Sequence, residues 1–65
     1  MRLVVNGVAQ EVAADNLATA LIRLDYGEVK VATALNGEFV PARRRDETAL
    51  RDGDRIEIVA PRQGG

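Results

Sequence analysis

The residues with the clearest chemical meaning are the last two, Gly64 and Gly65. Neither carries a side chain, so a chain that ends in them presents a bare carboxylate that can enter an active site too narrow for other residues. This shape suits a protein that is itself a substrate, with its own C-terminus as the reacting group. Two adjacent glycines at an end also arise by chance in about one chain in 200. A passive tail is therefore the alternative.

The sequence lacks most of the side chains that enzymes use. It contains no Cys, His or Ser, which removes the main zinc ligands, the thiolate nucleophile and the most common general base. Thr, Tyr and Lys30 are the nucleophiles that remain. The carboxylates of the second half lie among turn residues and arginines, where solvated loop charge is their expected role. This applies to four of them, Asp46, Glu47, Asp52 and Asp54. We expect a binding or carrier protein and no enzyme, with no metal or cofactor bound by the chain itself.

Size and charge limit the kinds of partner. The 65 residues have room for one small domain, residues 1–65, with a flexible tail over residues 61–65. The net charge is −1, and the one basic cluster, Arg43-Arg44-Arg45, is narrower than a nucleic-acid surface usually is. A solvated loop is its expected role, and contact with an acidic partner protein is the alternative. No apolar run approaches the roughly 20 residues that span a bilayer, and no leader pattern is present. We expect a cytoplasmic protein that binds neither nucleic acid nor membrane.

Two Asn-Gly pairs predict tight hairpins, because both residues tolerate the positive φ of a type I′ turn. Asn6-Gly7 should join a strand over residues 2–5 to one over residues 10–13. Asn36-Gly37 should join residues 29–35 to residues 38–40. Pro41 should end the second hairpin, because proline has no N–H for a ladder. Residues 42–50 are polar, with room for one helical turn around residues 48–50.

One helix is expected between the hairpins. Asp15 or Asn16 can cap its first turn, and Gly27 can end it as the left-handed residue. One apolar stripe recurs at helical spacing and should face the core. It consists of Leu17, Ala20, Leu21 and Leu24.

The last strand should follow the turn Asp52-Gly53-Asp54 and cover residues 55–59. Alternation places Ile56 and Ile58 on the core face and Val59 on the opposite face. The resulting order is hairpin, helix, hairpin, short turn and final strand. One helix on a four- or five-stranded mixed sheet is an α+β fold, with the first and last strands parallel and adjacent. This is the β-grasp fold of ubiquitin-like proteins.

Three stretches resemble the ThiS family, the sulfur carrier proteins of thiamine biosynthesis. They are residues 34–41 (ALNGEFVP), residues 50–59 (LRDGDRIEIV) and Gln63-Gly64-Gly65. The resemblance implies that a ThiF-like activating enzyme adenylates the Gly65 carboxylate with ATP. A persulfide enzyme then supplies sulfur to form a thiocarboxylate. A ThiG-like thiazole synthase would receive the tail, and the sulfur would enter the thiazole ring.

The resemblance also assigns roles to individual residues. Gly65 would carry the sulfur, and Gly64 would let the tail pass a constriction. Gln63 and Arg62 either form hydrogen bonds in the channel or are solvated. Strand alternation adds Val59, beside the root of the tail, as a candidate docking contact. Val4 on the neighbouring first strand should face the same way and form a small apolar patch with it.

Three other functions remain open from the sequence. The small subunit of molybdopterin synthase shares the fold and the activation chemistry but is usually longer. A ubiquitin-like modifier would be conjugated to lysines. An interaction domain would use its glycines only as a tail.

Overall fold

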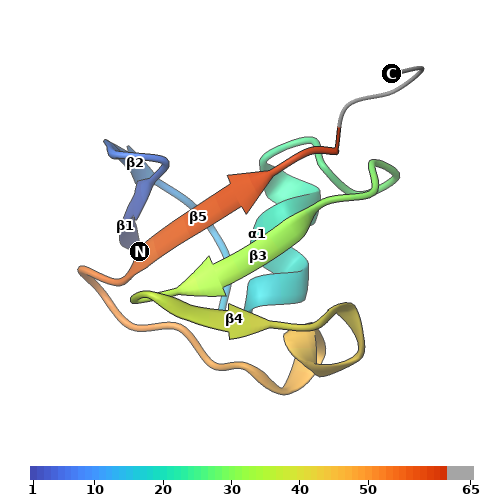
Figure 1. The fold of residues 1–65 in the computed structure, drawn as a ribbon. Helices are drawn as coiled ribbons and strands as arrows, with labels where there is room; N and C mark the ends of the chain where they lie inside the picture. The colour runs from blue at the N-terminus through green and yellow to red at the C-terminus, as the bar shows by residue number, and fades with distance from the viewer. Residues whose placement is uncertain (62–65) are drawn as a thin grey trace.

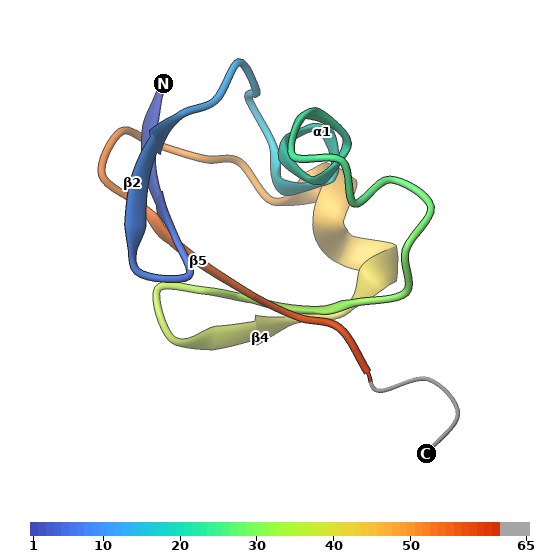
Figure 2. The ribbon, with the colours of Figure 1, turned by 90° about the horizontal axis from the view of Figure 1, so that it is seen from above.

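Five short strands form one mixed sheet in the computed structural model, which describes residues 1–61. The strands are β1 (Arg2–Val5), β2 (Val8–Glu11), β3 (Ala32–Leu35), β4 (Glu38–Val40) and β5 (Arg55–Val59). Their order is β2-β1-β5-β3-β4, with β1 and β5 parallel and the other neighbours antiparallel (Figure 1). The α-helix α1 (Leu17–Arg23) and the 3₁₀ helix η1 (Ala42–Glu47) lie on the same side of this sheet (Figure 2). The expected α+β, β-grasp fold is confirmed.

The core lies between α1 and the inner face of the sheet. Ile56 and Ile58 of β5 are buried, whereas the residues that alternate with them are exposed, as predicted. Burying a Leu, Ile or Val side chain contributes about 1.5–3 kcal/mol, so this layer is the main source of stability. The buried apolar residues are Leu3, Val5, Val12, Leu17, Ala20, Leu21, Val40, Leu50, Ile56 and Ile58.

Both hairpin turns have the predicted conformation. Asn6 and Gly7 have φ of 50° and 83°, and Asn36 and Gly37 have φ of 50° and 88°. The strand boundaries differ from the prediction. The returning strand β2 begins at Val8 and not at residue 10, because a two-residue turn places Val8 opposite Val5.

The strand β3 also begins later than predicted, at Ala32 and not at Val29. The amide of Val29 donates a hydrogen bond to the carbonyl of Tyr26 at 3.1 Å. The first residues of the β-prone run, which begins at Val29, are therefore part of the connection from α1. They do not join β3, although their β propensity predicted a strand.

The helix α1 begins where predicted, with Asn16 and not Asp15 as the cap. The Asn16 side chain accepts a hydrogen bond from the Thr19 amide at 2.8 Å, which satisfies a donor of the first turn. The predicted stripe is confirmed, since Leu17, Ala20 and Leu21 are buried and Leu24, the residue after α1, is half-buried against the same core.

The end of α1 differs from the prediction, because Asp25 and not Gly27 is the left-handed residue. Asp25 has a φ of 70° and donates its amide to the carbonyl of Ile22 at 3.1 Å. The Tyr26 amide reaches back to the carbonyl of Leu21 at 2.8 Å. These two bonds form a Schellman motif, so the helix ends two residues earlier than glycine placement suggested.

The arginine run is helical, although a polar loop was expected there. It lies in η1, whereas residues 48–50, where a helical turn was expected, are extended. The Leu17 amide donates to the Thr48 carbonyl at 2.9 Å, and the Leu50 amide donates to the Asp15 carbonyl at 2.9 Å. This pairing holds the segment against the start of α1 and buries Leu50.

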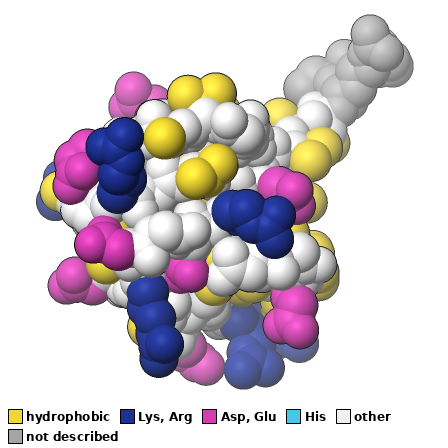
Figure 3. Space-filling model, turned by 90° about the vertical axis from the view of Figure 1, so that its left-hand side faces the viewer, with side chains coloured by type: hydrophobic (Ala, Val, Ile, Leu, Met, Phe, Trp, Pro, Cys, Tyr) yellow, Lys and Arg dark blue, Asp and Glu magenta, His cyan; other side chains and the backbone are white. Residues whose placement is uncertain are grey.

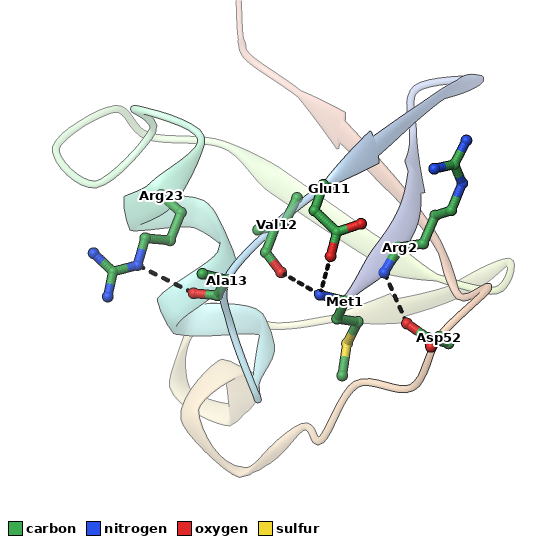
Figure 4. Close-up of polar contacts among 7 residues, drawn as sticks. All are labelled: Met1, Arg2, Glu11, Val12, Ala13, Arg23 and Asp52. Atoms are coloured by element: carbon green, nitrogen blue, oxygen red, sulfur yellow. Dashed lines mark hydrogen bonds and ion pairs between the residues drawn. The ribbon is translucent and has the colours of Figure 1, made fainter.

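Hydrogen bonds fix the start of the chain to its neighbours (Figure 4). The amino group of Met1 donates to the Glu11 carboxylate at 2.6 Å and to the Val12 carbonyl at 3.2 Å. The Arg2 amide donates to the Asp52 carboxylate at 2.7 Å. Asp52 was expected to be only solvated loop charge, but it connects the last turn to β1.

Candidate functional site

The strand β5 leads from the centre of the sheet to the segment that carries the predicted chemistry. It ends at Val59, and Ala60 and Pro61 are exposed. The predicted site residues Arg62, Gln63, Gly64 and Gly65 lie outside the described residues. What the structure describes is the surface from which residues 62–65 continue.

A shallow pocket of about 290 Å³ lies at this point, which we call the tail-root pocket. It is lined by Lys30, Val31, Ala32, Val59 and Pro61. Val59 is 65% exposed and is paired across the sheet with Ala32, so the outward orientation predicted for Val59 is confirmed. Lys30 is the charged residue of this otherwise apolar lining. The sequence reasoning missed Lys30 and Ala32, because their approach to Val59 depends on the register of β3 against β5.

A second exposed apolar residue, Phe39, lies on the outer face of β4. It is 70% exposed and opposite Ala34, which in turn is opposite Glu57. The sequence contained a signal for this orientation, since Phe39 precedes the core residue Val40 and neighbouring residues of a strand face opposite sides. The outer face therefore carries Val59 on β5 and Phe39 two strands away on β4.

The structure does not bring Val4 next to Val59. Val4 is opposite Arg55, four residues before Val59 on the same strand, which corresponds to about 13 Å at roughly 3.3 Å per residue. Val4 faces outward as predicted, since Leu3 and Val5 are buried, but it is too far from Val59 to share the expected apolar patch with it. The distance between Val4 and Val59 follows from the register of β1 against β5, which alternation within one strand does not predict.

The basic cluster does not act as one surface. Arg45 is half-buried, and its Nε donates to Thr33 Oγ1 at 3.0 Å while its Nη2 donates to the Val31 carbonyl at 2.6 Å. Arg43 and Arg44 are exposed. Figure 3 shows another face of the molecule, the side of β1 and β2, where Lys and Arg side chains lie among Asp and Glu side chains.

Residues 1–61 contain no group of three or more His, Cys, Asp or Glu side chains that could hold a metal ion. The carboxylate of Asp54 accepts hydrogen bonds from the Arg51 amide at 2.8 Å and from Asn36 Nδ2 at 3.0 Å, so it fixes a turn. Within the same part of the chain, no helix is long and apolar enough to cross a membrane.

Comparison with known proteins gives consistent results. A crystal structure of the thiamine biosynthesis protein ThiS from Geobacter metallireducens is 33% identical and has a TM-score of 0.82, with the match covering 100% of both chains. A protein named thiazole synthase from Paramagnetospirillum magneticum is 39% identical over 66 residues, which is 100% of this chain and 20% of that protein. The chain thus spans about a fifth of the length of that relative. The family model described as "ThiS family" matches residues 3–65, and this chain belongs to the ThiS family.

Proposed function

We propose that the protein is a sulfur carrier of thiamine biosynthesis and acts as a substrate of its partner enzymes, not as a catalyst. The observation that carries this proposal is the extent of the family match, which runs through residue 65 and so includes Gly64 and Gly65. The reacting group would be the Gly65 carboxylate. A carrier function also suits a chain without Cys, His or Ser.

The chemistry follows from the weak electrophilicity of a carboxylate. A ThiF-like enzyme would transfer AMP from ATP to the Gly65 carboxylate and release pyrophosphate, which creates a leaving group. The terminal sulfur of an enzyme persulfide would then attack the acyl carbon and expel AMP. A thiol would reduce the resulting disulfide bond and leave a thiocarboxylate on Gly65. A ThiG-like thiazole synthase would use this sulfur for the thiazole ring.

The described structure supports the division of labour between carrier and enzymes. The strand β5 is held by neighbours on both sides and ends at an exposed surface, so the domain can serve as a handle for residues 62–65. Gly64 would then pass the narrowest part of an enzyme channel, because it has no Cβ. Arg62 and Gln63 would contact the channel walls, and Val59 would contact the enzyme surface outside it.

The thiazole synthase relative supports the choice of sulfur acceptor. A stretch of that protein resembles this chain over its whole length, so a ThiS-like segment and a much longer remainder share one polypeptide. Two units on one chain meet at high effective concentration, which favours their acting on each other. We infer that a thiazole synthase is also the partner of this protein.

The test is an intact-mass measurement after incubation with ATP, a ThiF-like enzyme and a persulfide donor. The expected result is the mass gain for replacing one oxygen by sulfur, located on the C-terminal peptide. A variant without Gly65 is the matched control and should gain nothing. Conjugates with lysines of other proteins would indicate a modifier instead. No modification at all would favour an interaction domain.

A further inference from the structure

The last residue of β5 is held from one side of the strand. The strand β1 pairs with β5 up to Ile56, and the Asn6 side chain extends this contact to Ile58. Neighbouring residues of a strand direct their amides and carbonyls to opposite sides, so Val59 directs its own toward β3, where it is paired with Ala32. The pair Ala32–Val59 therefore fixes the point from which β5 leaves the sheet.

The start of β3 is held on its other side by an arginine and not by β4. The pairing of β3 with β4 begins at Thr33, opposite Val40, and Pro41 cannot continue it because proline has no N–H. The Val31 carbonyl instead accepts a hydrogen bond from Arg45 Nη2 at 2.6 Å. Arg45 Nε donates to Thr33 Oγ1 at 3.0 Å. One guanidinium thus holds the two residues that flank the β3 residue paired with the end of β5.

The short reach of the reacting end makes this point important. Four residues, 62–65, follow Pro61. Fully extended, they span at most about 14 Å, at 3.3–3.6 Å per residue. A displacement of the end of β5 shifts the whole range that Gly65 can reach. A misplacement of about 1 Å can lower the rate of a catalysed reaction by about 100-fold.

We propose, on the basis of the function proposed above, that Arg45 is a positioning residue for the adenylation of Gly65. It acts through β3: its two hydrogen bonds hold Ala32 in place, Ala32 holds Val59, and Val59 fixes the origin of residues 62–65. Without these bonds the end of β5 separates from β3 more often. Fewer docked carriers then present the Gly65 carboxylate in the geometry that the reaction needs.

Kinetics distinguish this role from a contribution to stability alone. A misplaced reacting end lowers kcat for adenylation, because the domain still binds and the chemical step becomes slower. A carrier that is only less stable is partly unfolded. The concentration of competent carrier is then lower, which raises the apparent KM and leaves kcat unchanged.

The test measures pyrophosphate release by the adenylating enzyme over a range of carrier concentrations. Arg45→Met keeps the length of the side chain but has no donor, so kcat should fall at least about fivefold while KM changes by less than about twofold. Arg45→Lys retains one donor group for the Val31 carbonyl, so its kcat should be intermediate and at least about twofold below the native value. Circular dichroism establishes that each variant is folded. An unchanged kcat in either folded variant would overturn the proposal, so Arg45→Lys decides alone if Arg45→Met does not fold.

Two control variants separate position from stability. Arg44→Met changes the exposed neighbour of Arg45 in η1, so kcat and KM should both stay within about twofold of the native values. Val12→Ala truncates a residue that is 3% exposed and directly follows β2, at the other edge of the sheet. It should destabilise the fold and raise KM alone. If Arg45→Met shows the same pattern as Val12→Ala, Arg45 only stabilises the fold and the proposal is wrong.

Amide hydrogen exchange tests the structural step without any enzyme. In Arg45→Met the Val59 amide should exchange faster by a larger factor than the Ile56 amide, because the end of β5 opens locally. Equal acceleration at both residues would overturn the proposal. If the native carrier is not adenylated at all, the function proposed above is wrong, whatever the exchange shows. If the native carrier is adenylated and Arg45→Met has the native kcat, that function stands and the positioning role is wrong.

Discussion

Asn6 and Ile58 exchange two hydrogen bonds, although they lie 52 residues apart. The Ile58 amide donates to Asn6 Oδ1 at 2.8 Å, and Asn6 Nδ2 donates to the Ile58 carbonyl at 3.2 Å. The side-chain amide thus continues the pairing of β1 with β5 beyond the end of β1. On the other side of β5, the side chain of Asn36 extends the pairing with β3, since its Oδ1 accepts a hydrogen bond from the Arg55 amide at 2.9 Å. Both hairpin turns therefore hold the strand that leads to residues 62–65.

The first prediction separates the two roles of Asn6. Asn6→Gly keeps the positive φ of the turn but removes both bonds to Ile58. Leaving two partly buried backbone groups without protein partners should lower the free energy of unfolding by about 1–3 kcal/mol. Asn6→Asp retains the acceptor and should lose less. Chemical denaturation measures both variants, and amide exchange at Ile58 reports the local effect. A Gly variant as stable as the native protein would show that turn conformation alone explains this residue.

The second prediction compares two adjacent arginines of η1. Arg45 donates to Thr33 and Val31, and Thr33 is 2% exposed, so Arg45→Ala should cost about 1–2 kcal/mol of stability. Arg44 forms an exposed ion pair with Glu47 at 3.9 Å, so Arg44→Ala should change stability by less than about 0.5 kcal/mol. Thermal or urea unfolding measures the difference. Equal effects of the two changes on stability would mean that the hydrogen bonds of Arg45 do not stabilise the fold.

The sequence was sufficient for the topology because its signals were local and mutually consistent. Asn-Gly turns, the stripe of α1 and the alternation of β5 each predicted one element, and the order of the elements left few ways to bury them together. Predicting the site required knowledge of contacts between residues that are distant in the sequence. The separation of Val4 from Val59 and the approach of Lys30 to Val59 both depend on strand register, which alternation within one strand does not predict. The inward orientation of Arg45 likewise depends on where η1 lies beside α1, since Arg45 reaches Thr33 of β3 from there.

The third prediction concerns the end of α1, where Asp25 holds a conformation that favours glycine. Asp25→Gly should raise the free energy of unfolding by about 0.5–1 kcal/mol, because glycine adopts a φ of 70° without a Cβ penalty. It also removes a negative charge near the negative end of the helix dipole. Gly27→Ala is the matched control. A Cβ there would meet Ile22 Cγ1 at 3.6 Å, an ordinary contact, so stability should change by less than about 0.5 kcal/mol. A larger loss of stability in Gly27→Ala would indicate that Gly27, and not Asp25, ends the helix.

The fourth prediction follows from the amino terminus. The hydrogen bond from Met1 to the Glu11 carboxylate raises the pKa of the amino group above its ordinary value of 8.0. A group with a raised folded-state pKa stabilises the fold fully below its unfolded-state pKa, and this contribution is lost as pH rises through the folded-state pKa. The native protein should therefore exceed Glu11→Gln in stability at pH 7, and the difference should shrink above about pH 8. Urea unfolding of both proteins across this range measures it. A difference that grows with pH would contradict the assignment.

The last prediction compares two neighbouring residues of β5 that face opposite sides. Ile58 is 6% exposed, so Ile58→Asp buries an unpaired charge and should unfold the domain. Val59 is 65% exposed, so Val59→Asp should leave the unfolding transition within about 0.5 kcal/mol of the native value. If Val59 contacts the adenylating enzyme, the same change should raise the carrier concentration needed for half-maximal adenylation at least several-fold, since anchors cost more than about 1 kcal/mol when replaced. Circular dichroism establishes the fold, and pyrophosphate release gives the rate. A folded Val59→Asp variant with unchanged kinetics would move the docking contact to another surface, and Phe39 on the same sheet face would be the next residue to test.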